Sequence, residues 1–271
     1  MDTDTAWDLW GVRDPYYGVL SHPKFRKDAL TNQSREEFFA SGKSDTEHVL
    51  SMCRRCAGAD YVPRRVLDFG CGVGRMVIPF AGVADAVVGV DIAASMIAEA
   101  QRNCADRGLS NVSFTYSDDA ISAVGGQFDL VHSSIVLQHI SIVRGRALFA
   151  ALVSRVAPFG CGVIHVTFGW DVYAESYGHP PPKPVLPKQS ILSSLIAGLR
   201  GIFKKSIAPQ ADSSSAEFAN QRDPEMQMNF YNLSELMFIL HQAGVKGVHS
   251  EFTNHGGALG VYLVFQRARS E

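Results

Sequence analysis

Apolar and polar positions alternate in two rhythms from about residue 64 onward. Five short runs are apolar at their centres and rich in β-branched residues, as buried parallel strands are; they are residues 64–70, 86–91, 112–117, 128–133 and 161–168. The longer segments 92–108 and 143–158 repeat apolar residues at helical spacing and end at Gly108 and Pro158. This alternation predicts parallel strands joined by crossover helices, which is an α/β fold.

The end of the chain continues the pattern with a change of direction. Residues 232–244 are typical of a helix, and residues 245–252 and 258–268 of two strands. The intervening TNHGG is a turn-forming sequence that suits an antiparallel hairpin. The elements together predict a seven-stranded, mostly parallel sheet with an antiparallel C-terminal strand and helices on both faces.

A proline-rich segment separates the fifth strand from the last helix. Residues 169–230 hold seven of the twelve prolines and the polar run ADSSS, so we expect an insertion that acts as a lid over a substrate. Within it, residues 191–205 carry an apolar stripe at helical spacing, with basic residues off the stripe. Three interpretations of this stripe stay open: packing on its own domain, a dimer contact, or peripheral binding to a membrane surface.

The first 60 residues have a different character. They contain two aromatic clusters, WDLWG and DPYYGVL, followed by a helix-like stretch at 34–56. We therefore expect an N-terminal aromatic and helical cap at residues 1–60 and one domain at residues 61–271 that includes the lid.

Composition and charge argue against several functions. The 271 residues carry 25 Lys and Arg against 27 Asp and Glu, a net charge of −2, which argues against nucleic-acid binding held mainly by phosphate contacts. No apolar run approaches the roughly 20 residues of a membrane span, and the acidic start MDTDTAWDLW is unlike a signal peptide. The five cysteines fit reduced thiols better than a disulfide framework. We expect a cytoplasmic protein that acts on a small molecule; the oligomeric state stays open.

A glycine-rich turn follows the first strand. Gly70, Gly72 and Gly74 allow a ligand to approach the backbone, because no Cβ stands in the way. A dinucleotide site would place a third glycine where this chain has Arg75. Asp68, two residues before the first glycine, would repel a pyrophosphate and attract a cation. The turn therefore favours a ligand with an ammonium and a sulfonium group over a dinucleotide.

These residues resemble the class I S-adenosylmethionine-dependent methyltransferases, whose first motif, D-x-G-x-G-x-G, appears here as DFGCGVG. The resemblance implies a Rossmann-like sheet, S-adenosylmethionine as cofactor, and an acidic residue after the second strand that takes the two ribose hydroxyls; that residue is Asp91. SDDA at 117–120 resembles the third-strand motif, in which Asp118 would meet the adenine amino group with Asp119 beside it. The backbone around Ser133 and Ser134 would hold the methionine end.

The resemblance extends the expected cofactor site to neighbouring residues. We expect Cys71 to pack at the turn and not to act as a nucleophile, and Arg75 to lie beside the cofactor. Ile92 and Met96 would form apolar walls against the adenine. Tyr17, with Tyr16, would close over it. No metal is expected, since the position after the fourth strand holds serines where metal-dependent relatives place an aspartate ligand.

Methyl transfer to a hydroxyl requires alignment and a base. Candidates must follow the strand ends that face the ligand, and His139 and His255 meet that condition: His139 follows the fourth strand, and His255 lies in the TNHGG turn if the strand before it runs parallel to the others. His132 and His165 lie within strands, where core positions are expected.

The acceptor pocket should be lined by the segments outside the shared motifs. The expected substrate residues are Trp170, Tyr173, Gln227, Asn229 and Tyr231, since aromatic and amide groups suit a sugar or a polar ring. The chain also resembles bacterial small-molecule and glycan methyltransferases of polysaccharide and natural-product pathways. The favoured hypothesis is an O-methyltransferase acting on a sugar, a lipid-linked saccharide or a natural product. The alternatives are N-methylation of a small amine or a protein, and a non-catalytic partner subunit with the same fold.

Overall fold

A computed structural model of the chain describes residues 2–181 and 223–268. One sheet dominates the described part, with strands in the order β3-β2-β1-β4-β5-β7-β6. Its strands are β1 Arg65–Phe69, β2 Ala86–Asp91, β3 Val112–Tyr116, β4 Phe128–Ser133, β5 Val156–Trp170, β6 Val248–His255 and β7 Ala258–Gln266. The first five strands pair in parallel, and β7 runs antiparallel to both β5 and β6. This arrangement confirms the fold class that the sequence predicts.

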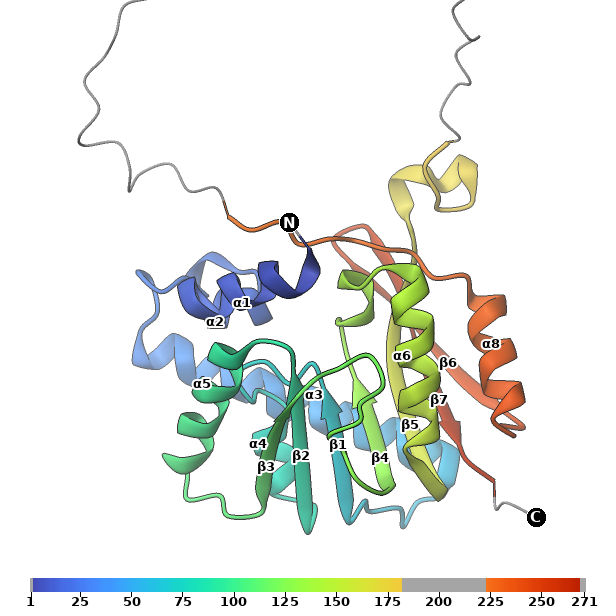
Figure 1. The fold of residues 1–271 in the computed structure, drawn as a ribbon, viewed down its shortest axis with the longest axis horizontal. Helices are drawn as coiled ribbons and strands as arrows, with labels where there is room; N and C mark the ends of the chain where they lie inside the picture. The colour runs from blue at the N-terminus through green and yellow to red at the C-terminus, as the bar shows by residue number, and fades with distance from the viewer. Residues whose placement is uncertain (1, 182–222, 269–271) are drawn as a thin grey trace, which may run out of the picture. The chain divides into compact units, whose positions relative to one another are not determined.

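Helices cover both faces of the sheet, and Figure 1 shows α6 in front of it and α3 behind. The helices are α1 Thr3–Arg13, α2 Pro15–Val19, α3 Asn32–Ala57, α4 Val77–Ala81, α5 Ala94–Ala105, α6 Ile142–Ser154 and α8 Leu233–Gln242, and the short 3-10 turns are η1 Pro23–Phe25, η2 Leu137–His139 and η3 Asp171–Ser176. Along β1, Leu67 packs in the core against α6 and α8, while Val66 packs in the core against α3 and α4. Because successive side chains of a strand point to opposite faces of the sheet, β1 contributes to the cores on both faces.

The N-terminal segment packs on the sheet domain through a third apolar cluster. Trp10 and Tyr16 contact the aromatic side chains of α3 and the apolar side of α5, including Met96. The Tyr16 hydroxyl is 2.7 Å from Glu99 Oε1 and 3.1 Å from Asn103 Oδ1, both on α5. Residues 1–60 were expected as a cap, and their described part belongs to the same compact unit as the sheet.

The end of α6 differs from the expectation. The sequence pattern predicts that this helix extends to Pro158, but α6 ends at Ser154 and β5 already begins at Val156. The proline is accommodated because the pairing of β4 with β5 shifts register: Phe128 pairs with Val156, and the next pair joins Leu130 to Cys161. A bulge of this kind leaves strand residues unpaired, which removes the need for the N–H that proline lacks.

The chain divides into two units at His179 and Pro224. Of the second unit, residues 180–223, the structure describes only the ends, so the predicted stripe at 191–205 lies outside the described residues and its role stays a prediction. Within the described ranges, none of the helices combines the length and apolar character that a membrane crossing requires.

Candidate active site

A cavity of about 550 Å³ lies at the carboxyl ends of β1, β2 and β4. Open α/β sheets bind ligands at this edge, where the connections leave the strands. Its walls come from α1 and residues 18–21, the turn after β1, the segments after β2, β3 and β4, the ends of β5 and β6, and residues 226–228. All of these parts belong to the unit that contains the sheet.

The glycine turn after β1 forms one wall of the cavity. Gly70 and Gly72 adopt φ angles of +74° and +52°. A Cβ on Gly70 would lie 2.2 Å from Cγ2 of Val136, and a Cβ on Gly72 would lie 2.5 Å from Cγ2 of Val19. Both the φ angle and the space require glycine at these positions. The turn therefore packs closely against the segment after β4 and against the N-terminal segment.

Asp91 ends β2 beside this turn and lines the cavity. Its Oδ2 accepts a hydrogen bond from the backbone N–H of Gly72 at 2.8 Å, and its Oδ1 accepts one from Ala93 at 3.0 Å. Burial raises the pKa of this carboxyl, and the backbone donors oppose that rise. Each carboxylate oxygen has a second lone pair, so the group retains the acceptors that a ribose diol needs.

Asp68 forms a negatively charged part of the cavity wall, with 3% of its surface exposed. His132 on β4 pairs with it in register, and Nδ1 of His132 is 2.7 Å from Oδ1 of Asp68. His132 is therefore buried, as expected, and its partner is Asp68. A carboxylate beside the glycine turn suits a cationic ligand and not a diphosphate.

The segment after β3 brings one of two neighbouring aspartates to the cavity. Asp118 is the residue expected from the motif, but its Oδ1 accepts hydrogen bonds from the backbone N–H groups of Ala120 and Ser122 at 3.1 and 2.8 Å. Asp119 lines the cavity and forms an ion pair with Arg144 of α6. The structure therefore assigns the cavity wall to Asp119, because Asp118 is occupied in capping its own turn.

Arg144 joins three parts of the chain at the cavity wall. Its Nη1 and Nη2 bind the two carboxylate oxygens of Asp4 in α1 at 2.6 and 2.9 Å, and its Nε binds Asp119. These carboxylates raise the pKa of Arg144 and keep it cationic. A bidentate pair of this kind is among the stronger polar contacts in proteins. Sequence analysis misses it because no local pattern marks a pair 140 residues apart.

The segment after β4 combines a hydrogen bond with backbone strain. Ser134 lines the cavity, and its Oγ is 2.8 Å from the hydroxyl of Tyr262. Ser133 is buried outside the cavity lining. Ile135, also on the lining, adopts a φ of +58°, which is rare for a β-branched residue and costs on the order of 1–3 kcal/mol. Strain of this kind concentrates at functional loops.

His139 lies at the end of η2, lines the cavity and is 8% exposed. Its Nδ1 is 2.7 Å from the backbone oxygen of Gln227. A carbonyl oxygen can only accept, so Nδ1 carries the proton and Nε2 of the neutral ring keeps its lone pair. Burial lowers the pKa of His139, and the hydrogen bond to Gln227 opposes this. The ring is therefore held in the protonation state of a general base.

The loop that carries His139 is held from two sides. Thr3 of α1 donates its hydroxyl to the backbone oxygen of His139 at 2.7 Å, and the Trp7 ring lies 4.9 Å from the imidazole between centroids. Below the loop, the Tyr231 hydroxyl is 2.8 Å from the backbone oxygens of both Leu137 and Ile140. The N-terminal helix is thus part of the support for the candidate base.

His255 reaches the same cavity from the end of β6. Because β7 is antiparallel to both its neighbours, β6 runs parallel to β5, which is the condition that the sequence argument set for His255. Its ring lies 5.3 Å from that of His165, whose Nε2 is 2.9 Å from the Thr253 hydroxyl. Burial lowers the pKa of His165 to about 3, so His165 is neutral and sits in the core as expected.

Residues 226–231 cross the loop after β4 as an extended strap. The backbone N–H of Asn229 donates to Gln138 at 2.7 Å, and that of Tyr231 donates to Thr167 at 2.8 Å. Met226 and Met228 line the cavity, whereas Gln227, Asn229 and Tyr231 are absent from its lining. The expectation for these three side chains is therefore off by one residue, because successive side chains of an extended segment point to opposite sides.

Thirteen of the sequence-selected residues line the cavity: Asp68, Gly70, Cys71, Gly72, Arg75, Asp91, Ile92, Met96, Asp119, Ser134, His139, Trp170 and His255. The others, all described by the structure, lie outside the lining: Tyr17, Gly74, Asp118, Ser133, Tyr173, Gln227, Asn229 and Tyr231. Tyr17 packs against Arg26, whose guanidinium carbon is 3.4 Å from the ring centroid, so its neighbours Gly18 and Val19 face the cavity instead.

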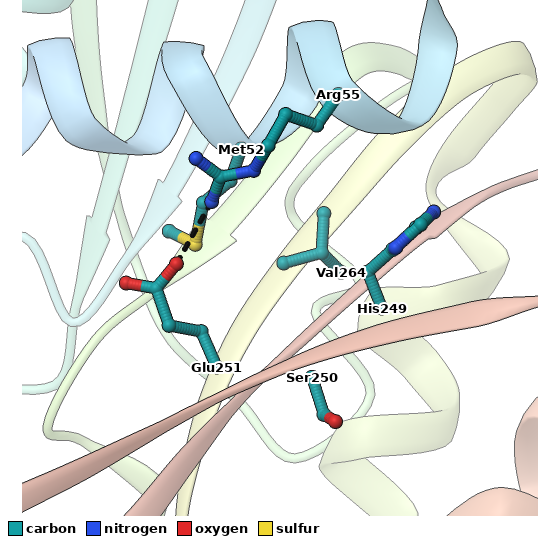
Figure 2. Close-up of a pocket in the computed structure, with 6 residues that line it drawn as sticks. All are labelled: Met52, Arg55, His249, Ser250, Glu251 and Val264. Atoms are coloured by element: carbon teal, nitrogen blue, oxygen red, sulfur yellow. Dashed lines mark hydrogen bonds and ion pairs between the residues drawn. The ribbon is translucent and has the colours of Figure 1, made fainter.

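A second, smaller pocket of about 240 Å³ lies between α3 and β6 (Figure 2). Figure 2 shows Arg55 of α3 bridging to Glu251 of β6, at 2.8 Å. Its lining shares no residue with the large cavity. We therefore place the candidate active site in the large cavity alone.

Comparisons with known proteins agree with this fold. The family described as "Methyltransferase domain" matches residues 66–160. The structure superposes with a TM-score of 0.56 on magnesium protoporphyrin IX methyltransferase from Synechocystis PCC 6803 with bound S-adenosylmethionine, at 19% identity over 99% of this chain and 98% of that one. The ubiquinone biosynthesis O-methyltransferase of Brucella anthropi is 26% identical over 186 residues, 63% of this chain and 72% of the relative.

A shorter likeness covers one fifth of the chain. A 23S rRNA (uracil(1939)-C(5))-methyltransferase of Shewanella sediminis is 46% identical over 54 residues, which is 20% of this chain and 12% of the relative. The chain therefore spans about an eighth of that relative's length.

The fold is the Rossmann-like fold of the methyltransferase on which the chain superposes, and residues 66–160 match a methyltransferase domain. The cavity lining fits S-adenosylmethionine, because Asp91 retains acceptors that would suit a ribose diol and the Asp68 carboxylate would suit a cationic group.

Proposed function

We propose that the protein transfers the methyl group of S-adenosylmethionine to a hydroxyl of a small molecule or glycan, with His139 as the general base. The observation that carries the proposal is the tautomer of His139, a residue of the cavity lining, whose Nδ1 donates to the Gln227 backbone oxygen and leaves Nε2 as the acceptor of the ring. A hydroxyl must lose its proton as it is methylated, which is the task of such a base. The Brucella anthropi relative, named as an O-methyltransferase, supports this choice.

Each group of the site has a task in this reaction. Asp91 and the backbone of the glycine turn would hold the ribose, and Asp68 would face the ammonium group. When bound, S-adenosylmethionine supplies an electrophilic methyl group, so that the bond from acceptor oxygen to carbon forms as the sulfur–carbon bond breaks and the sulfur leaves as a neutral thioether. Nε2 of His139 takes the proton of the acceptor hydroxyl, and His255 lines the same cavity as a second polar contact.

The substitution His139→Asn tests the proposal. The asparagine amide can still donate to the Gln227 oxygen, but it has no basic nitrogen, so we expect transfer of labelled methyl groups to hydroxyl acceptors to fall by about 10²–10⁴-fold. The affinity for S-adenosylmethionine, measured by calorimetry, should stay within about twofold. Asp91→Asn should show the opposite pattern and lose donor affinity. Wild-type turnover in His139→Asn would contradict the role of the base.

The rate should also depend on pH in a defined direction. Because burial lowers the pKa of His139, the neutral base is already formed at neutral pH. We expect kcat to be flat above about pH 6.5, the usual value for histidine, and to fall only below it as Nε2 takes a proton. A rising limb centred above pH 6.5 that vanishes in His139→Asn would contradict the lowered pKa.

The remaining expectations extend the same proposal. We propose a cytoplasmic enzyme of natural-product or polysaccharide biosynthesis that does not act on nucleic acid, supported by the net charge of −2.

A further inference from the structure

Charged groups are unevenly distributed around the cavity. Among the described residues, its lining includes four carboxylates, those of Asp4, Asp68, Asp91 and Asp119, and two guanidinium groups, those of Arg75 and Arg144. The formal sum of these side chains is two negative charges. A donor with a sulfonium, an ammonium and a carboxylate adds one positive charge, so the lining remains negative when the donor is bound.

Both arginines of the described lining already form ion pairs, although the buried Nε of Arg75 has no hydrogen-bond partner. Nη1 of Arg75 is 2.6 Å from a carboxylate oxygen of Asp45 on α3. Arg144 is bound by Asp4 through two hydrogen bonds and by Asp119 through a third. An acceptor carboxylate or phosphate would have to displace one of these partners, or remain unpaired in a partly desolvated site, and both cost free energy.

The rest of the lining is suited to a flat apolar ring. Trp7 lies beside His139, with 4.9 Å between ring centroids, and Trp170 lines the cavity at the end of β5. Methionine side chains are flexible, and their sulfur makes favourable contacts with the edges of aromatic rings. The apolar side chains of the lining include Trp7, Ile140, Leu148, Trp170, Met226 and Met228.

From this charge pattern and these walls we propose that the acceptor is an aromatic hydroxyl compound without an anionic group. The proposal rests on the proposed function and narrows the class of acceptor. A pyrophosphate-linked saccharide or an aromatic acid would meet only arginines that already form ion pairs, among the described groups. Asp4, Asp119 and Arg144 thereby determine specificity: the two carboxylates neutralise the cation that would otherwise attract an anion.

A binding comparison tests the proposal without turnover. 4-Hydroxybenzyl alcohol and 4-hydroxybenzoate share the phenol and differ in charge at pH 7.5. Each is titrated by calorimetry into the protein saturated with S-adenosylhomocysteine. We expect the neutral probe to bind at least about tenfold more tightly, a difference of about 1.4 kcal/mol. The preference should shrink as salt is added, because salt screens charge.

The double variant Asp4→Asn/Asp119→Asn tests the cause. It leaves Arg144 without its two carboxylate partners, so the preference for the neutral probe should fall severalfold toward equality. The matched control is Asp8→Asn, the same charge change at an exposed position of α1, which should keep the wild-type preference. A ratio of two affinities in one protein cancels any general damage to the site.

The outcomes separate this inference from the proposed function. It is overturned if 4-hydroxybenzoate binds wild type as tightly as the alcohol, if neither probe binds, or if the double variant keeps the full preference. If the acid binds better and is methylated in a His139-dependent way, the proposed function stands without this acceptor class. If the preference holds but no hydroxyl compound is methylated, the proposed function fails while the charge selection stands.

Discussion

Tyr231 offers a direct test of how the loop that carries His139 is held in place. Its side chain is 1% exposed, and its hydroxyl is 2.8 Å from the backbone oxygens of Leu137 and Ile140, on either side of His139. Gly145 of α6 makes room for it, because a Cβ there would lie 1.8 Å from the hydroxyl oxygen. The substitution Tyr231→Phe removes only that oxygen and leaves both carbonyl groups without this donor.

The expected magnitude follows from burial. A buried acceptor that loses its donor costs about 1–3 kcal/mol, and the ring that stays behind keeps the apolar contacts. We therefore expect the free energy of unfolding of Tyr231→Phe to fall by about 1–3 kcal/mol. Because the two carbonyls that lose the hydroxyl lie on either side of His139, kcat should fall as well, on the order of tenfold, since small displacements of a catalytic group are costly.

The control is Tyr16→Phe, which also removes a buried hydroxyl, in this case one bound to Glu99 and Asn103 at a distance from the loop of His139. Urea unfolding and methyl-transfer kinetics are measured on both variants and the wild type. Tyr16→Phe should lose stability with little change in kcat, whereas Tyr231→Phe should lose both. Equal kcat values in the two variants would refute the claim that Tyr231 positions the base.

Two further predictions concern the glycine turn and the core. Gly72→Ala should weaken S-adenosylmethionine binding in calorimetry by on the order of tenfold, because φ +52° costs a side chain about 1–2 kcal/mol and the new Cβ would meet Val19 at 2.5 Å. His165 should make stability fall with acid: its pKa is about 3 when folded and about 6.5 when unfolded, so its contribution is complete above pH 6.5 and is lost as the pH falls toward 3. Between pH 7 and 5 the loss should be about 2 kcal/mol, and urea titrations of His165→Gln should lack it. Binding by Gly72→Ala at wild-type strength, or an unchanged pH slope in His165→Gln, would contradict these arguments.

The fold was within reach of sequence reasoning because its signals are local. Apolar runs bounded by turns mark each parallel strand, and their order along the chain leaves few ways to build the sheet. The same holds for the turn from Gly70 to Gly74 and for Asp91: a motif at a strand end lies at the ligand edge whenever the strand is assigned correctly. The end of α6 was missed because a bulge in β5 accommodates Pro158.

Only the tertiary structure decided which side chains complete the site. Asp119 replaces Asp118 at the wall because Asp118 caps its own turn. Met228 replaces Gln227 and Asn229 because successive side chains of an extended segment point to opposite sides. The pairing of Arg144 with Asp4 joins segments far apart in the chain, and no periodicity records such a contact. The sequence by itself determined the sheet and the place of the glycine turn and Asp91 at its edge, since these depend on local pattern and chain order. The charge and shape of the acceptor wall depend on long-range packing, which only the folded chain specifies.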